Sequence, residues 1–372
     1  MYLVLCSDNK VFMEDKLIDR GWSMNFPGSG WVSALYEMAE DKDIKVLSGD
    51  IALSEIQRQE LSPDQVFILD DMGSKIAKKL LKIGCRPFAI SCFESVIYAP
   101  FFYDKIDLIS NKFNLRLGFG FNSLFEDSIY LVNICKFPAY YRNQLKNIPD
   151  WNTRRKVVVV SSNKYLSSFP YIPGRISLSN IFFQIKSLIR KIRSKSYAIS
   201  LSQSLFNERL QIIHFFLRKQ ALDIYGSGWE NLDTLPKAWF EKLEWLMPNA
   251  YKGRCEDKLE TLRNYKFAIC YENMSSNDYV TEKIIDCFVA GCIPIYMGAP
   301  NIKKIISPSS YIDVNDFSDI EEIYSYIDSM SETQAMAMTT SGRNYLASAE
   351  GSLYCYENFA ERILNEAVKC KI

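Results

Sequence analysis

The segment from residue 267 to residue 300 constrains the fold more than any other part of the chain. Residues 267–271 form a short apolar run that suits a buried strand, and the polar residues after it lack alternation, as in a loop. Apolar residues at helical spacing then start after Asp278, a good helix N-cap, and stop at Gly291, a good helix-ending residue. Residues 292–296 form the next apolar run. The pattern predicts strand, loop, helix and strand, the repeating unit of a parallel α/β sheet.

The loop and helix start of such a unit lie at the carboxyl end of the sheet, where open α/β folds bind ligands. Free N–H groups in the first helical turn attract an anion, and Lys283 adds a full positive charge nearby. These features favour a pyrophosphate. The pattern alone fits equally well a solvated Lys283 and a Glu282 that merely favours the first turn through the helix dipole.

Several motifs in and around this unit resemble a known family. They are Tyr265-Lys266-Phe267, Glu272-Asn273, the run from Asp278 to Lys283, Pro294, Gly298, and the run from Tyr311 to Phe317. Polar residues that recur at fixed spacing are more specific than a lone glycine motif. The set is similar to the signature of family 10 glycosyltransferases, the α-1,3/1,4-fucosyltransferases that use GDP-fucose. The similarity is weaker upstream, through residues 157–163 and 223–226, and is absent from about the first hundred residues.

The resemblance implies an α/β fold of the GT-B type, in which two Rossmann-like domains with parallel sheets face each other across a cleft. It also implies metal-independent transfer with inversion at the sugar. Arg209 is included in the expected donor site because residues 206–210 match a family helix that carries an arginine, and Gly226 because it ends a strand in a ligand-facing turn. The donor-binding residues that we expect are Arg209, Gly226, Glu272, Asn273, Tyr279, Glu282 and Lys283.

The resemblance also suggests a catalytic base in the first half of the chain. In the family, a carboxylate that opens an acidic tetrad just before a strand and a proline is the proposed base. Glu126, in the tetrad Glu126-Asp127-Ser128-Ile129, matches that place, with Asp127 as the alternative. Spacing alone would favour a solvated acidic loop.

Composition and length limit the class of protein. With 372 residues we expect two domains, residues 1–150 and 151–350, and a last helix at 351–372 that crosses back to the first domain. The formal net charge of zero gives no reason to expect a nucleic-acid partner. Ten cysteines without a C-x-x-C pair favour a reducing cytoplasm, and no segment has the length of a membrane span.

Metal and cofactor chemistry are not expected. The single histidine, His214, falls on an apolar helical pattern and is more typical of a packed side chain than of a catalytic base. One histidine excludes a multi-histidine metal site, and Asp70-Asp71 has the wrong spacing for the metal loop of GT-A enzymes. We therefore expect no bound metal, and the family resemblance implies GDP-fucose as the donor substrate.

Two further segments leave alternatives open. The stretch from Asn180 to Lys195 predicts a basic amphipathic helix, which fits either a peripheral contact with an anionic membrane or a helix that covers a core. The glycine-rich stretch between Gly28 and Trp31 fits either an acceptor contact or a tight turn beside a packed tryptophan.

Together these observations predict a cytoplasmic enzyme, with or without peripheral membrane contact, that moves L-fucose from GDP-β-L-fucose to a glycan hydroxyl. The expected role is synthesis of surface polysaccharide or lipopolysaccharide. A transferase for another GDP sugar is the first alternative, since no residue in the motif visibly recognises the fucose methyl group. A non-catalytic protein that binds nucleotide sugars is the second.

Overall fold

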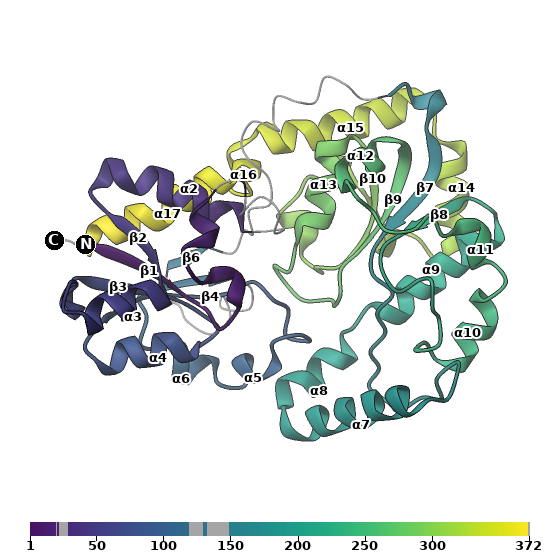
Figure 1. Ribbon diagram of the computed structural model, residues 1–372. Helices are drawn as coiled ribbons and strands as arrows, with labels where there is room; N and C mark the ends of the chain where they lie inside the picture. Colours follow the sequence, from purple (N-terminus) through teal and green to yellow (C-terminus); the bar gives the residue numbers. More distant parts are fainter. Residues whose placement is uncertain (20, 22–28, 119–128, 132–148, 371–372) are drawn as a thin grey trace. The chain divides into compact units, whose positions relative to one another are not determined.

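The computed structural model describes residues 1–19, 21, 29–118, 129–131 and 149–370. The chain divides into two compact units (Figure 1). Unit 1 comprises Met1–Ser95, Phe101–Tyr141 and Ala349–Ile372, and unit 2 comprises Val96–Pro100 and Arg142–Ser348. Glu126 and Asp127 lie outside the described residues, so their expected role stays a prediction.

Unit 1 is built on a parallel sheet with helices packed around it. Its described strands are ordered β2-β1-β3-β4-β5-β6. The strands are β1 (Tyr2–Cys6), β2 (Lys45–Ser48), β3 (Val66–Asp71), β4 (Arg86–Cys92), β5 (Leu115–Gly118) and β6 (Ile129–Leu131). The helices are α2 (Gly30–Ala39), α3 (Gly49–Gln57), α4 (Lys75–Lys82), α6 (Ile106–Ser110), α16 (Ala349–Ser352) and α17 (Tyr356–Lys369), with α5 (Pro100–Tyr103) where the chain passes between units.

The carboxyl end of β3 carries a buried acid. Asp70 is 2 % exposed, and its Oδ1 accepts hydrogen bonds from Ser74 N (2.9 Å) and Ser74 Oγ (2.7 Å). Burial raises the pKa of Asp70 to about 6, because loss of solvation disfavours the charged form more than these hydrogen bonds favour it. Ser74 in turn caps α4 by accepting a bond from Ala77 N.

Helix α17 is part of unit 1 although unit 2 separates it in sequence from the other elements. It packs along α2, and Trp31 of α2 meets Phe359 of α17 edge-on at a ring-centroid distance of 5.4 Å. The contact is close enough that a Cβ added to Gly30 would lie 2.4 Å from the Tyr356 ring. Trp31 is therefore a core side chain, whereas Gly28 lies outside the described residues.

Unit 2 has a second parallel sheet, with strand order β11-β10-β9-β7-β8. The strands are β7 (Arg155–Val160), β8 (Leu222–Tyr225), β9 (Tyr265–Tyr271), β10 (Ile293–Met297) and β11 (Ile312–Asp313). The helices are α7 (Leu178–Arg193), α8 (Lys195–Ser202), α9 (Phe206–Arg218), α10 (Lys237–Leu243), α11 (Met247–Ala250), α12 (Lys258–Arg263), α13 (Glu282–Ala290), α14 (Ile320–Ser329) and α15 (Glu332–Ala347).

The apolar strands of unit 2 form its core, because both faces of the sheet are buried. Helices α9 and α14 share one apolar cluster with strand residues such as Val157, Phe267 and Ile295. In register, Val158 pairs with Ala268 and Tyr271 with Met297, so neighbouring strands end at the same edge of the sheet. This edge brings together the loops that follow β7, β9 and β10.

The strand, loop, helix and strand expected from residues 267–300 are confirmed as β9, α13 and β10. Cys270, Cys287 and Cys292 are buried free thiols, as their apolar surroundings indicated. Among the described residues, no helix is long and apolar enough to cross a membrane.

Candidate functional site

A buried carboxylate organises the loop between β9 and α13. Glu272 follows directly after β9 and has no exposed surface. Its carboxylate accepts hydrogen bonds from Thr281 N (2.8 Å) and Thr281 Oγ1 (2.9 and 2.8 Å), and from Lys283 Nζ (2.7 Å). Gly298 makes room for it, because a Cβ there would lie 2.6 Å from Glu272 Cγ. Glu272 thus fixes the start of α13 and the position of its lysine.

Lys283 keeps its charge although it is largely buried. Its side chain is 20 % exposed, and its ammonium also donates to Thr281 Oγ1 (2.8 Å). Burial alone would lower the pKa of Lys283, but the negative charges of Glu272 and Glu282 outweigh that effect and hold the pKa well above its usual value. Lys283 is therefore a fixed positive charge in the first turn of α13.

The N-cap expected at Asp278 is wrong. Thr281 occupies that position, and α13 begins at Glu282. Asp278 instead has a left-handed backbone (φ 61°) and pairs with Asn301, which accepts from Asp278 N (2.9 Å) and donates to its carboxylate (2.8 Å). This clamp holds the loop that presents Tyr279, which is 5 % exposed.

Arg209 lies in the same small cavity as Lys283. The cavity is lined by the ends of β7 and β9, by α9 through Arg209, and by α13 through Lys283. The start of α9 is tied to the loop after β9, because Leu205 N donates to Asn273 O (3.1 Å) and Ser275 N to Gln203 O (2.8 Å). These backbone bonds hold the start of α9, which carries Arg209, beside the loop that leads to Lys283.

The Arg209 guanidinium is buried without a matching acceptor. The residue is 5 % exposed, and within the part of the chain that the structure describes its guanidinium makes no hydrogen bond or ion pair. The guanidinium carbon of Arg209 lies over the Phe206 ring, 5.0 Å from the ring centroid. Burial lowers the pKa of Arg209 to about 10, and the charges of Tyr98 and Glu272 offset this only in part. A guanidinium presents five donors, so this group is suited to an anion with several oxygens.

Lys258 is a further cation that the sequence did not suggest. It opens α12, lines the same cavity as Arg209 and Lys283, and forms an ion pair with Asp286 of α13 (2.7 Å). Burial would lower the pKa of Lys258, but Asp286 and Glu282 raise it above the usual value. A single lysine after a helix cap has no motif or spacing that would predict it as a site residue. Its place in the cavity follows only from the packing of α12 on α13.

Other expected residues have clear structural positions. Gly226 follows β8 with φ 131°, and a Cβ there would lie 2.1 Å from Ser161 O. The glycine therefore permits the loops after β7 and β8 to approach each other closely. Asn273 contributes its backbone carbonyl to the contact with α9. Their contact with a donor substrate stays a prediction.

His214 packs on α10 rather than lining this cavity. Its ring lies edge-on to Trp239 at 6.1 Å, and burial lowers its pKa, with Lys242 and Arg218 acting in the same direction. Within the described ranges, no group of three histidine, cysteine or acidic side chains has the geometry to hold a metal ion.

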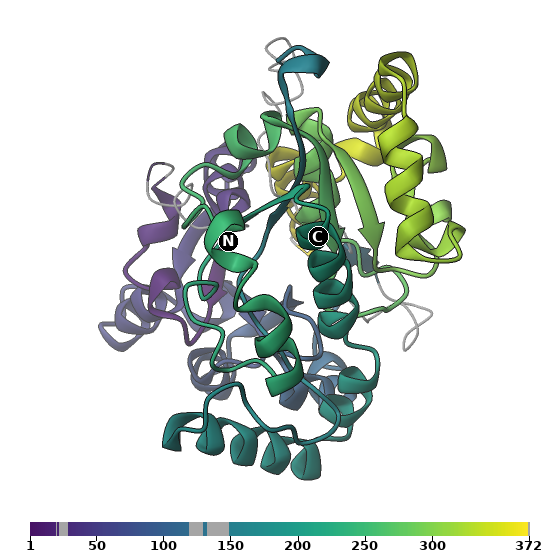
Figure 2. The same cartoon turned by 90° about the vertical axis from the view of Figure 1, so that its right-hand side faces the viewer.

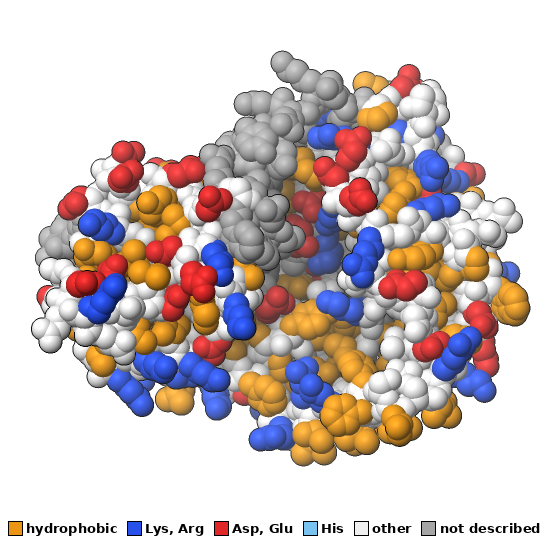
Figure 3. Space-filling view, in the orientation of Figure 1, with side chains coloured by type: hydrophobic (Ala, Val, Ile, Leu, Met, Phe, Trp, Pro, Cys, Tyr) orange, Lys and Arg blue, Asp and Glu red, His pale blue; other side chains and the backbone are white. Residues whose placement is uncertain are grey.

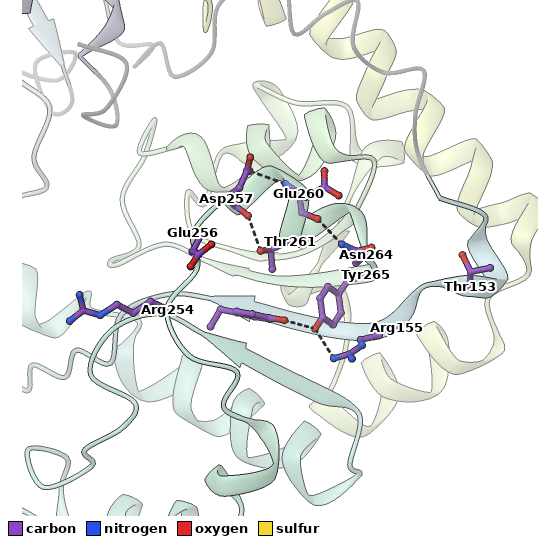
Figure 4. A pocket seen from close by; sticks show the side chains of 10 residues that line it. Thr153, Arg155, Arg254, Glu256, Asp257, Glu260, Thr261, Asn264 and Tyr265 are labelled. Atoms are coloured by element: carbon purple, nitrogen blue, oxygen red, sulfur yellow. Dashed lines mark hydrogen bonds between the residues drawn. The ribbon is translucent and has the colours of Figure 1, made fainter. Parts of the chain in front are cut away.

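A larger cavity of about 570 Å³ lies near the amino ends of β7 and β9 (Figure 4). Figure 4 shows Arg155 and Tyr265 pointing toward each other there. Both side chains bond Asp223: Arg155 Nη1 lies 2.7 Å and Tyr265 Oη 2.7 Å from its Oδ2. Because these polar groups satisfy one another, this cavity has a weaker claim to an anionic ligand than the site around Arg209.

Two α/β units, each with one parallel sheet, define the GT-B class of fold. The solved structure of a glycosyltransferase from Rickettsia africae ESF-5 has this fold, with a TM-score of 0.51 at 9% identity over 99% of this chain and 97% of that chain. Residues 190–339 match the family described as Glycosyltransferase family 10 (fucosyltransferase) C-term. This segment, which contains Arg209, Lys258 and Lys283, is therefore similar to the C-terminal part of glycosyltransferase family 10.

Curated relatives match parts of the same region. The alpha-(1,3)-fucosyltransferase FucT of Helicobacter pylori is 36% identical over 105 residues, which are 28% of this chain and 22% of that protein. An alpha-(1,4)-fucosyltransferase of Arabidopsis thaliana is 30% identical over 117 residues, 30% of this chain and 29% of the relative. The matches thus span less than a third of either relative.

Proposed function

We propose that this protein transfers L-fucose from GDP-β-L-fucose to a hydroxyl of a glycan acceptor, in an α-1,3 or α-1,4 linkage. The observation that supports the proposal best is the buried Arg209 guanidinium, which lacks an acceptor among the described residues and shares its cavity with Lys283 and Lys258. A diphosphate supplies the oxygens that the Arg209 guanidinium lacks, next to the positive charges of Lys283 and Lys258. The similarity of the surrounding segment to this fucosyltransferase family favours GDP-fucose as the compound that carries the diphosphate.

Loss of the GDP leaving group is the first chemical task. As the bond between the anomeric carbon and the β-phosphate oxygen breaks, negative charge develops on the diphosphate. Arg209, Lys283 and the N–H groups at the start of α13 stabilise that charge without a metal ion in this proposal, and preorganised charge of this kind is worth several kcal/mol, roughly 3–4 for one donor. Lys258 adds positive charge from α12.

Glu272 has an indirect part in this mechanism. Its contacts are with Thr281 and Lys283, so it holds the lysine in place and keeps it protonated. Tyr279 and Glu282 stand at the start of α13 and are proposed to contact the ribose or the sugar, with Glu282 also stabilising positive charge on the ring.

The second task is removal of a proton from the acceptor hydroxyl. We assign it to Glu126, by resemblance to the family, with Asp127 as the alternative. The acceptor oxygen attacks the anomeric carbon opposite the departing GDP, its proton passes to the carboxylate, and the configuration changes from β to α. One base and a single displacement therefore give inversion.

The proposed setting is synthesis of surface polysaccharide or lipopolysaccharide in the cytoplasm. A transferase for another GDP sugar remains the alternative, because the groups around Arg209 and Lys283 recognise the diphosphate and leave the sugar undetermined. A non-catalytic protein that binds nucleotide sugars is the second alternative. It differs from a transferase in that it does not consume the donor.

Titration calorimetry and donor turnover test the proposal. GDP should bind in EDTA-treated buffer, and GDP-fucose should be consumed faster than GDP-mannose or a UDP sugar, with EDTA leaving the rate unchanged. Activity abolished by EDTA and restored by a divalent ion would refute the metal-free mechanism. Binding of GDP without consumption of any donor, in the presence of a panel of glycans, would favour the non-catalytic alternative.

A further inference from the structure

Helix α7 has its apolar side chains facing away from the rest of unit 2. Helices of globular proteins usually bury an apolar stripe, yet none of the residues of α7 is buried. Eight of them are large and apolar, with exposed fractions between 43 % and 88 %. Phe183 lies toward the attachment side, and the other seven share one side of the helix: Leu178, Ile181, Phe182, Ile185, Leu188, Ile189 and Ile192. We call these seven residues the α7 stripe. In Figures 1 and 2, α7 lies along the outer edge of unit 2.

The opposite face of α7 attaches it to unit 2 through polar groups. Asn180 Nδ2 donates to Arg175 O (2.9 Å) and Asp233 O (3.2 Å). Ser187 Oγ bonds the Tyr197 hydroxyl (3.1 Å), and Lys191 Nζ donates to Ser168 O. At about 100° per residue, positions 180, 187 and 191 fall on one side of the helix and the α7 stripe is centred on the other. Hydrogen bonds therefore hold the polar side of α7 against unit 2 and leave its apolar side facing outward.

Neighbouring side chains extend the exposed apolar surface. Phe169, Ile172 and Ile176 precede α7 and are 75 %, 63 % and 75 % exposed. The ammonium of Lys191 lies 5.3 Å from the centre of the Phe169 ring, which places that ring beside the helix. Figure 3 shows hydrophobic side chains gathered with basic ones along the corresponding edge. Contiguous apolar surface of this kind marks an interaction site.

The charges on α7 select the partner. Lys186, Arg190, Lys191 and Arg193 are its ionisable residues, and the helix contains no acid. Two copies of α7 would bring like charges together, which disfavours a homodimer through this face. A basic amphipathic helix with a wide apolar stripe instead fits the plane of an anionic bilayer, with the stripe in the acyl region and the cations among the phosphates.

We propose that the α7 stripe binds an anionic lipid surface, with α7 lying parallel to the membrane. The inference is independent of the sugar that the enzyme transfers and of the residues around Arg209. It gives the protein a peripheral attachment, in which apolar insertion and attraction of Lys186, Arg190 and Arg193 to lipid phosphates act together.

Vesicle sedimentation tests this attachment. The wild-type protein should sediment with vesicles of equimolar phosphatidylglycerol and phosphatidylcholine, remain in solution with phosphatidylcholine alone, and leave the anionic vesicles in high salt, which screens the attraction. The variant Ile185→Glu/Ile192→Glu should lose at least about tenfold in vesicle affinity, a change of about 1.4 kcal/mol. Both positions are exposed and glutamate is a good helix former, so the fold should persist.

A matched control separates the stripe from net charge. Leu108→Glu/Met336→Glu adds the same charge at positions that are 71 % and 60 % exposed and lie outside α7, and it should sediment like wild type. Circular dichroism spectra and urea unfolding midpoints equal to those of wild type would establish that both variants are folded. Wild-type protein that stays in solution with anionic vesicles, or equal sedimentation of the two variants, would overturn the proposal. Equal binding to neutral vesicles would overturn the choice of anionic lipid. Dimerisation lost only in the α7 variant, without vesicle binding, would assign the stripe to a second copy.

Discussion

Arg209 offers the sharpest test of the donor site, because its loss should affect stability and ligand binding in different ways. Arg209→Met keeps the length of the side chain and removes the guanidinium. Arg209 as a residue is 5 % exposed, and no described residue accepts a hydrogen bond from its guanidinium. A buried polar group left unsatisfied costs about 1–3 kcal/mol. The free energy of unfolding of the ligand-free variant should therefore be unchanged or higher by about 1 kcal/mol.

Binding of GDP should change in the opposite sense. Hydrogen bonds to charged groups contribute about 1.5–3 kcal/mol, so Arg209→Met should raise the Kd for GDP about 10- to 150-fold. Urea denaturation gives the first quantity and titration calorimetry the second. Both are measured on the same preparation of the 372-residue protein.

Arg154→Met is the matched control. The Arg154 guanidinium donates to Pro149 O from Nε (2.9 Å) and Nη2 (2.8 Å), and to Gly291 O from Nη1 (2.8 Å). Its loss should lower the free energy of unfolding by about 1–3 kcal/mol and leave GDP affinity unchanged. If Arg209→Met instead showed this pattern, with lost stability and intact GDP binding, Arg209 would be a structural residue and the assignment of the anion site would be wrong.

Three further outcomes are expected. Lys283→Ala should weaken GDP binding by about 1.5–3 kcal/mol in calorimetry and also lower the unfolding free energy, because Glu272 loses its ammonium partner; normal GDP affinity would place the lysine outside the site. Glu126→Gln should retain GDP affinity while the transfer rate, measured with labelled GDP-fucose, falls by roughly two to four orders of magnitude; near-normal rates in both this variant and Asp127→Asn would mean that the base lies elsewhere. The folded pKa of Asp70 lies at about 6, above the ordinary aspartate value of 3.8, so its contribution to stability is present at low pH and is lost as pH rises through 6. Between pH 7 and about pH 5 the wild-type protein should therefore gain about 1 kcal/mol relative to Asp70→Asn in urea denaturation, and equal pH dependence of the two proteins would contradict the raised pKa.

The strands and helices around the site were predictable because their apolar residues repeat with a clear period. The run at residues 267–271 lies within β9, and Gly291 closes α13 with φ 69°. The N-cap was missed for a tertiary reason. Asp278 is the better cap by residue type, yet Asn301, distant in sequence, holds it in a left-handed conformation and leaves the cap to Thr281.

Charge relations inside the site were less predictable than its elements. Glu272 and Lys283 both belong to the family motif, but their mutual ion pair depends on how the loop folds back over the end of β9. Lys258 has no motif, and its place comes from an ion pair with Asp286 on another helix. For α7 the sequence left packing and membrane contact equally open. The outward direction of its stripe depends on the bonds of Asn180, Ser187 and Lys191 to the rest of unit 2.

The pairing of α17 with α2 imposes an order on folding during synthesis. Tyr356, Phe359 and Ile363 are buried in the core that also contains Trp31, but the ribosome makes them only after the whole of Arg142–Ser348. Unit 2 has all its strands before α17 exists, so the unit that starts first along the chain is completed last. Throughout that interval the apolar face of α2 lacks its partner and is open to chaperones or to aggregation. A nascent chain stalled before Ala349 should therefore hold a native unit 2 beside an incomplete unit 1.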